Sequence, residues 1–305
     1  IEATDAAGSK LVSIDTNSSN DTYLNLPSVG IGTNVVETDN SFEIYSPTAS
    51  KTSLAVAAGA SSAGWVGIGT SEPVFPLDAS NVAKANIGAA NSKINSTGSA
   101  ILGGANHQIS GDFDVIVGGV INNISGGDFN FIGGGSGIDV TGSDYSSSVG
   151  GYNNDILSSD FAIIAGGFNN LVSGAEGSVL GGGKDNTIQG INAVIAGGQS
   201  NTIHTGGQYS FIGAGGSNVI RGQNNVIAGG INHEISGDMA VIIGGSDNKV
   251  EADRGVVGGN RSYVQAGHTG AWVFSDSSVT HALSSGIDTL GLHFNNGVYV
   301  ESTSG

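Results

Sequence analysis

The central part of the chain repeats itself with a period of 15 or 16 residues. Between Ile87 and Gly267 a β-branched residue follows a glycine-rich corner by about five places in turn after turn, as in AVIAGGQSNTIH at Ala193–His204. A unit this short cannot bury its own apolar residues, so neighbouring units must stack to make a core. The repeat therefore predicts an all-β chain built as a parallel β-roll or β-helix solenoid of about 12 coils. The β-branched residues that set its register are Ile94, Ile109, Ile124, Val140, Ile156, Val172, Ile188, Ile203, Ile220, Ile235, Val250 and Val264.

Each repeat contains two short strand patterns, and they differ. The second alternates polar and apolar residues, as in Asn201–His204, so one face is expected inside the coil and the other in water. The first places two apolar residues side by side, as in Val194-Ile195, so both of its faces call for burial. We predict that the more uniform row lies inside: Ile101, Ile116, Ile132, Ile164, Leu180, Ile195, Ile212, Ile227 and Ile242. The less uniform row is predicted to face neighbouring chains: Val115, Phe131, Ile163, Val179, Val194, Phe211, Val226 and Val241.

The outward apolar row predicts self-association. A contiguous apolar stripe of this length is rarely left in water, and the chain has nothing else with which to cover it. A head-to-tail contact that closes makes a ring, and three copies are the expected number for a fibrous β-roll. We therefore expect a homotrimer whose interface runs along residues 100 to 257.

The motifs resemble those of trimeric fibre proteins. The repeats resemble the left-handed β-roll heads of trimeric autotransporter adhesins, and more closely the GGxxNxIxG arrays of phage tail fibres and bacterial surface proteins. Val66–Pro73 followed by Leu77-Asp78 is similar to the VGIGTxxP…LDV module of such fibres, and Val29–Thr33 is a shorter copy. Gly270–Ser277 is similar to the GAFVWADS segment that closes such arrays. The resemblance implies a trimeric fibre and says little about its ligand.

Composition and charge narrow the function further. The 53 glycines suit a coil with a corner every few residues, and the absence of cysteine excludes disulfides and cysteine-based metal sites. A net charge of −17 with nine Lys and Arg argues against binding nucleic acid or an anionic membrane. No run of apolar residues is long enough to predict a membrane span. The bland interpretation of the acidity is a solvated surface that keeps a fibre soluble.

The sequence divides into three predicted parts. Residues 1–85 are a β-rich stalk or neck module with two GIGT corners, strand-like patterns at Leu11–Ile14 and Phe42–Tyr45, and an Ala- and Ser-rich neck at 55–64. Residues 86–268 form the β-roll. Residues 269–305 form a β capping segment that contains Trp272 and other large apolar residues.

No motif predicts a catalytic, cofactor-binding or metal site. Gly133–Asp139 resembles a calcium-binding nonapeptide, but Asp139 has no regular successors at the nine-residue period that such a roll needs. The carboxylate pairs Asp112 with Asp114 and Glu251 with Asp253 are interpreted as loop solvation. His107 and His233 share one repeat position eight turns apart and are expected on the surface, with a ring around a trimer axis as the alternative.

Asparagine recurs just after the glycine corner and predicts a ladder of stacked amides that stabilises the turns. A flat polar face for a glycan is the alternative. The residues are Asn91, Asn106, Asn123, Asn154, Asn170, Asn186, Asn201, Asn218 and Asn232.

We therefore expect a non-enzymatic, structural and adhesive homotrimeric module, most simply part of a phage tail fibre or other virion fibre that contacts a host surface. Its expected partners are its own copies, a host glycan or protein receptor, and a neighbouring fibre, baseplate or anchor protein. The expected location is the virion surface or the extracellular or cell surface. Recognition is expected at the corners Asp139–Ser148 and His204–Tyr209 and around Trp272. A bacterial adhesin, a passive stalk or filament subunit and a glycan-cleaving tailspike are the alternatives.

Overall fold

The computed structural model describes residues 91–276 and 281–298, and before residue 91 the backbone of short strands alone. The chain forms two compact units, Ile1–Ser80 and Asn81–Gly305, and no helix occurs among the described residues. In the first unit β1 (Glu2–Thr4) pairs antiparallel with β2 (Lys10–Ser13). A four-stranded sheet follows, made of β3 (Ser41–Tyr45), β4 (Thr52–Ala57), β5 (Val66–Gly67) and β6 (Leu77–Asp78).

The strands predicted at Leu11–Ile14 and Phe42–Tyr45 correspond to β2 and β3. The first GIGT corner and most of the predicted neck at 55–64 lie outside the described residues.

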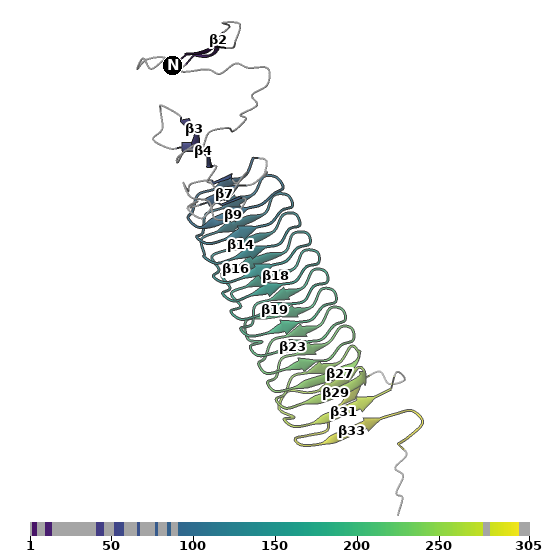
Figure 1. Ribbon diagram of the computed structural model, residues 1–305. Helices are drawn as coiled ribbons and strands as arrows, with labels where there is room; N and C mark the ends of the chain where they lie inside the picture. Colours follow the sequence, from purple (N-terminus) through teal and green to yellow (C-terminus); the bar gives the residue numbers. More distant parts are fainter. Residues whose placement is uncertain are drawn as a thin grey trace, which may run out of the picture. The chain divides into compact units, whose positions relative to one another are not determined.

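The second unit is a solenoid of two parallel sheets, and each coil contributes one short strand to each sheet (Figure 1). The first sheet has 14 strands. They are β7 (Lys84–Asn86), β9 (Ser99–Ile101), β11 (Val115–Ile116), β13 (Phe131–Ile132), β15 (Ser147–Ser148), β17 (Ile163–Ile164), β19 (Val179–Leu180), β21 (Val194–Ile195), β23 (Phe211–Ile212), β25 (Val226–Ile227), β27 (Val241–Ser246), β29 (Val256–Asn260), β31 (Trp272–Ser275) and β33 (Leu290–His293).

The second sheet has 13 strands. They are β8 (Lys93–Ile94), β10 (Gln108–Ile109), β12 (Asn123–Ser125), β14 (Asp139–Thr141), β16 (Asp155–Leu157), β18 (Leu171–Ser173), β20 (Thr187–Ile188), β22 (Thr202–Ile203), β24 (Val219–Ile220), β26 (Glu234–Ile235), β28 (Lys249–Val250), β30 (Ser262–Val264) and β32 (Ala282–Leu283). The predicted all-β parallel solenoid of about 12 coils is therefore confirmed.

The core is one row of aliphatic side chains from each sheet, packed against the other. Every residue of the predicted inner row, from Ile101 to Ile242, is fully buried, and so are the register residues from Ile109 to Val264. Like residues stack on like residues because the pairing is parallel and in register, as where Ile195 pairs with Leu180 above and Ile212 below. Between β9 and β31 of the first sheet, Ser148 interrupts the aliphatic row, and its buried hydroxyl has no partner among the described residues.

The chain turns at the corners through residues with positive φ, which are either glycine or another residue type. A glycine with positive φ recurs as the second member of the Gly-Gly pair, as at Gly198 (φ 96°), where it lies directly over the carbonyl of Gly215 in the next coil. Other corners place a non-glycine residue in the left-handed region, often Asn or Asp, which tolerate it best. The corners therefore depend on particular residue types as much as the core does.

Candidate functional site

The outer face of the first sheet is a candidate association surface. Its first row is the predicted outward one, and Phe131, Ile163, Phe211 and Val226 in it are exposed. A second row lies two residues further along each strand and contains small or apolar residues only. Its members are Leu102, Val117, Gly133, Val149, Ala165, Gly181, Ala196, Gly213, Ala228, Ile243 and Gly258.

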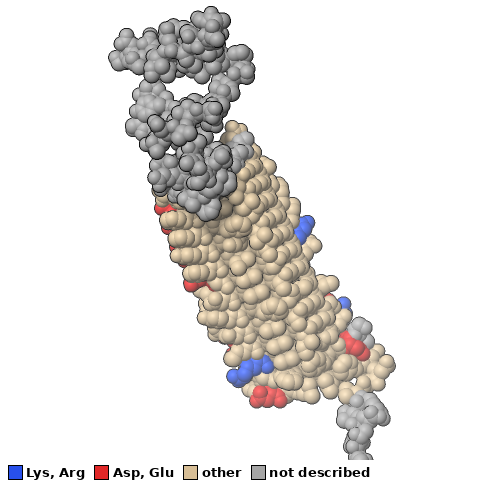
Figure 2. Space-filling view, viewed as in Figure 1, with Lys and Arg blue, Asp and Glu red and all other residues tan. Residues whose placement is uncertain are grey.

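These two rows, from Ala100 to Gly258, contain no charged residue, and Ser147 is their one polar member. In Figure 2 the charged side chains in view lie along the edges of the solenoid, and the broad surface between them carries none. The outer face of the second sheet is different, because Asp139, Asp155, Glu234 and Lys249 lie on it. One flat face of the solenoid is thus apolar and the other polar, as the two strand patterns predicted.

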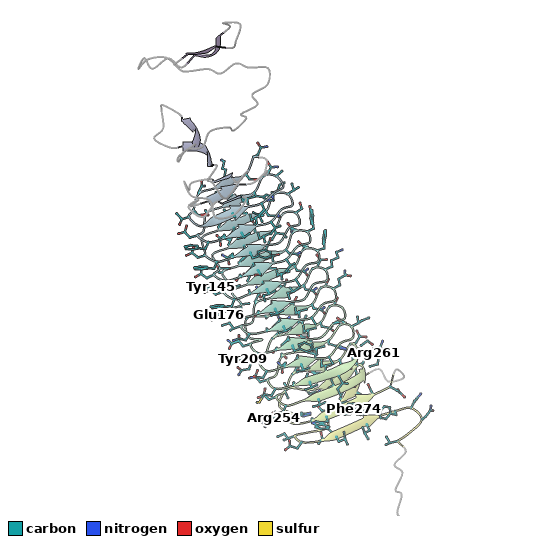
Figure 3. All side chains as sticks on the ribbon, in the orientation of Figure 1. Tyr145, Glu176, Tyr209, Arg254, Arg261 and Phe274 are labelled. Atoms are coloured by element: carbon teal, nitrogen blue, oxygen red, sulfur yellow. The ribbon has the colours of Figure 1, made fainter. Side chains whose placement is uncertain are left out.

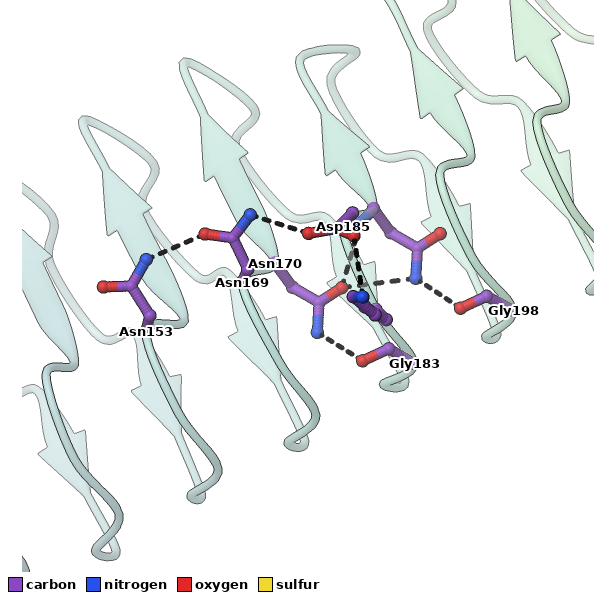
Figure 4. A network of polar contacts seen from close by, with 8 residues as sticks. Asn153, Asn169, Asn170, Gly183, Asp185 and Gly198 are labelled. Carbon is purple, nitrogen blue, oxygen red and sulfur yellow. Dashed lines mark hydrogen bonds and ion pairs between the residues drawn. The ribbon is translucent and has the colours of Figure 1, made fainter.

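A ladder of buried amides runs beneath the Gly-Gly corner (Figure 4). The backbone N–H of Asn186 donates to Oδ1 of Asn170 (3.0 Å), and the N–H of Asn201 donates to Oδ1 of Asn186 (3.0 Å). The amide nitrogen of each ladder residue also donates to two backbone carbonyls of the corners, as Asn186 does to Gly182 (3.0 Å) and Gly198 (2.9 Å). A buried backbone N–H or C=O group is costly unless it forms a hydrogen bond. The ladder supplies hydrogen-bond partners for the backbone groups at the glycine corner.

The predicted amide ladder is correct for part of the asparagines. Asn154, Asn170, Asn186, Asn201 and Asn218 are its buried members. Asn122 and Asn248 belong to it and were not predicted. Asn91, Asn106 and Asn232 lie one position earlier in the repeat, outside the buried ladder, and take the left-handed backbone of the turn themselves. The prediction was wrong for Asn123, which lies in strand β12.

The prediction that His107 and His233 lie on the surface was also wrong. Both are almost fully buried, and they take the place of asparagine in the ladder: Nδ1 of His107 accepts the N–H of Asn122 (3.1 Å), and Nδ1 of His233 accepts that of Asn248 (3.2 Å). An acceptor at Nδ1 requires the neutral ring that carries its proton on Nε2. Burial lowers the pKa of both imidazoles, which favours that neutral form.

Asp114 lies inside the coil, so its interpretation as loop solvation was wrong. Its Oδ1 accepts the N–H of Asn130 (2.7 Å), whereas its buried Oδ2 has no partner among the described residues. Side chains at this position in other coils donate to a carbonyl 12 or 13 residues further on, as Asn130 does to Ser143 (2.6 Å) and Ser99 to Gly111 (3.1 Å). The corresponding carbonyl for Asp114 is that of Gly127. A Cβ placed on Gly111 would lie 2.5 Å from Oδ2 and 1.6 Å from this carbonyl oxygen, so the two oxygens lie close together.

Neither a carboxylate nor a carbonyl oxygen can donate a hydrogen bond, so Asp114 can make this contact only when its carboxyl group is protonated. Burial raises the pKa of Asp114 to about 6; the charges of Asp128 and Asp112 add to the rise, and the hydrogen bonds from Asn130 oppose it. The carboxyl group of Asp114 therefore binds a proton more tightly in the folded chain than in the unfolded chain. The contribution of Asp114 to stability is full below about pH 4 and is lost as the pH rises through about 6.

We expect Asp114→Asn to stabilise the solenoid at pH 7 and to leave its stability at pH 4 nearly unchanged. Asparagine fills this position in two other coils and donates the hydrogen bond that a carboxylate cannot. A pKa shift of this size corresponds to about 3 kcal/mol. Denaturant midpoints of the two proteins between pH 4 and 8 measure the effect, with Asp160→Asn as control because Asp160 is only partly buried and its charge is not among those that raise the pKa of Asp114. Equal stabilisation at both pH values would show that Asp114 is not the titrating group.

The other predicted acidic residues have separate environments. Glu251 pairs with Lys249 (2.8 Å) and accepts a hydrogen bond from Tyr263, whereas Oδ1 of Asp253 accepts the N–H of Asp238 (2.9 Å). Asp139 lies in β14, where its N–H donates to Asp155 (3.2 Å). Residues 91–276 and 281–298 hold no group of three His, Asp or Glu placed to bind a metal ion.

The segments predicted to carry recognition have different structures. Asp139–Ser148 was expected to be a corner that breaks the period, and that expectation was wrong, because the segment covers β14, a turn and β15 inside a coil of ordinary length. His204–Tyr209 forms the turn after β22 and does lengthen its coil, because Ile203 pairs with Ile220. Trp272 is half exposed in β31, which continues the outer face of the first sheet next to β33.

Comparison with known proteins leaves this surface to be interpreted from its own chemistry. No protein-family model matches the chain, and no curated protein matches its sequence. Within the part of the chain that the structure describes, no helix is long and apolar enough to cross a membrane.

Proposed function

We propose that this chain is a structural and adhesive module of a homotrimeric fibre, of the kind that a phage tail carries to contact a host surface. The observation that supports the proposal is the outer face of the first sheet, two rows wide and free of charged residues from Ala100 to Gly258. Hydrophobic burial contributes about 25 cal/mol for each Å² of apolar surface removed from water, and a face repeated coil after coil offers a long strip of it.

The size of the strip suits association between copies. Successive coils are about 4.8 Å apart, and ten steps separate the eleven rungs from Ala100 to Gly258, so the strip is on the order of 48 Å long. The two rows give it a width of about 10 Å, so each chain presents a few hundred Å² of flat surface, which is modest for one pairwise contact. If three chains each turn this face toward a common axis, each face contacts both of the other chains and is removed from water. In that arrangement the polar outer faces of the second sheet stay in solvent.

The polar faces and the corners then carry the contacts with other molecules. In this proposal a host-surface glycan or protein receptor binds there, a neighbouring fibre, baseplate or anchor protein holds the base, and the module works at a virion or cell surface. Three copies present each contact three times, so weak contacts add through avidity. Binding of the folded protein to intact host cells tests the adhesive part, and a protein that binds no cell surface would be a passive stalk.

Sedimentation tests the trimer directly. We expect the folded protein to sediment at about three times 30.2 kDa. Val194→Asp, in the outer row of β21, should give a folded monomer because it places three charges in the common interface. Thr202→Asp, on the polar outer face of β22 in the same coil, is the matched control and should stay trimeric. A stable wild-type monomer with native β-sheet circular dichroism would contradict the proposal.

A further inference from the structure

A stripe of four stacked aromatic rings runs along one corner of the solenoid. Phe113, Phe129, Tyr145 and Phe161 occupy the same position in four successive coils. Their rings stack almost parallel, with centroids 5.0, 4.9 and 5.3 Å apart. We call these four residues the aromatic stripe. All four remain exposed, from 47% for Phe129 to 55% for Phe161, so stacking covers only part of their surface.

The aromatic stripe occupies backbone that does not favour it. All four residues have positive φ, between 55° and 61°, which is unusual for a bulky side chain. Later coils fill the same corner either with Gly177, Asn192 and Asn224, the residue types that the left-handed region prefers, or with other large side chains at Tyr209, Met239 and Arg254. Only the aromatic stripe places large side chains there in four successive coils. Mutual stacking offsets part of the strain. Large apolar side chains that are both strained and exposed indicate a surface that binds a partner.

A row of carboxylates runs beside the aromatic stripe. Each ring is preceded by an aspartate: Asp112, Asp128, Asp144 and Asp160. One oxygen of each aspartate accepts a backbone N–H from the coil before, at 2.8 Å, so the carboxylates are held in line. Within the described residues their second oxygens have no hydrogen-bond partner, and none of the four forms an ion pair. Figure 3 places Tyr145 and Glu176 along the same edge, and Figure 2 shows acidic side chains along it.

We propose that the aromatic stripe and its aspartate row form a docking surface for an extended, lysine- and arginine-rich protein segment. Such a segment would complement the surface in two respects. The ammonium or guanidinium groups pair with the aligned carboxylates. The aliphatic stems of the same side chains lie across the exposed ring edges, because Lys and Arg cover apolar surface while their charged ends stay polar.

The dimensions fit a short segment. Three steps of about 4.8 Å separate the first and last rungs, on the order of 15 Å, which four or five residues of extended chain span. The surface lies at the corner that precedes the strands of the first sheet, and all four rings are exposed in the single chain.

Fluorescence anisotropy with a labelled pentapeptide of alternating lysine and arginine tests the proposal on the full chain. We expect saturable binding that weakens as salt is added. Phe129→Asn with Tyr145→Asn keeps the charge and installs a residue that this corner already accepts, and it should weaken binding at least tenfold. Asp128→Asn with Asp144→Asn should weaken it by a similar factor. Asp139→Asn with Asp155→Asn makes the same change of charge on the outer face of the second sheet and should weaken it less than twofold.

Three results would contradict the proposed docking surface. Equal weakening by the two aspartate pairs would mean that net charge alone attracts the peptide, and it would overturn the proposal. Full binding by the asparagine variant of the rings would do the same, because the aromatic stripe would then have no part in recognition. Absence of binding by the folded wild-type protein at low salt would also overturn it. Circular dichroism of each variant confirms that the coils are intact.

Discussion

Aspartate in place of Ile195 is expected to unfold the solenoid around its coil. Ile195 is fully buried in β21, where it pairs with Leu180 in the coil before and Ile212 in the coil after. The change removes a large aliphatic side chain from a closely packed row and leaves a charge with no partner. Together these effects cost about 5 kcal/mol or more. Because each coil is stabilised by its neighbours, the loss extends beyond one turn.

The neighbouring residue supplies the control. Val194 lies in the same two-residue strand with its side chain on the outer face, so Val194→Asp should leave the monomer folded. Circular dichroism and urea midpoints of the two variants measure the difference. If Ile195→Asp is tolerated as well as Val194→Asp, the inward and outward rows are assigned the wrong way round.

Much of the fold could be predicted from the sequence because it follows from periodicity. A repeat of 15 or 16 residues with two apolar sites leaves few arrangements other than a two-sheet coil. The inner and outer rows were separable because Ile is nearly uniform in one, whereas Val, Phe and Ser147 mix in the other. Uniformity is what stacking inside a narrow coil demands, since a misfit is repeated against both neighbours.

The corners could not be predicted to the residue. Asn122 and Asn123 are adjacent, and which of them enters the ladder depends on where the left-handed residue falls, here at Ile121. Nothing in the sequence alone fixes that position. His107 was misplaced for a related reason: a histidine is ordinarily exposed, and its ring enters the ladder because Nδ1 accepts the N–H that an amide oxygen accepts in other coils.

Asp114 and the aromatic stripe show the same limit. In a regular strand, residues two apart such as Asp112 and Asp114 would point to the same side. Here Phe113 between them has positive φ, so Asp114 is buried while Asp112 stays partly exposed, and the sequence alone does not show this turn. The Asp-Phe and Asp-Tyr pairs recur at the coil period, so the stripe left a signal in the sequence. Its stacking and exposure became evident only in three dimensions.

Alanine in place of Gly198 is expected to be nearly as damaging as a charge in the core, although it adds a single methyl group. Gly198 has a φ of 96°, which side chains rarely adopt. A Cβ at this position would lie 2.2 Å from the carbonyl oxygen of Gly215 and 2.7 Å from the amide nitrogen of Asn201. Neither can withdraw easily, because the Gly215 carbonyl accepts the backbone N–H of Gln199 and the amide of Asn201 belongs to the ladder. Strain and overlap together should cost on the order of 3 to 5 kcal/mol.

The first glycine of the same pair makes the comparison sharp. A Cβ on Gly197 would meet nothing within 4 Å, so Gly197→Ala should change the urea midpoint little. The two variants have the same composition and differ only in which member of the Gly-Gly pair carries the methyl group. Their midpoints therefore measure the corner itself, and amide exchange along the chain would show whether the damage spreads through the ladder to Asn186 and Asn218. Similar midpoints for the two variants would mean that the corner accommodates a side chain, and that the recurrence of glycine there is not imposed by contact between coils.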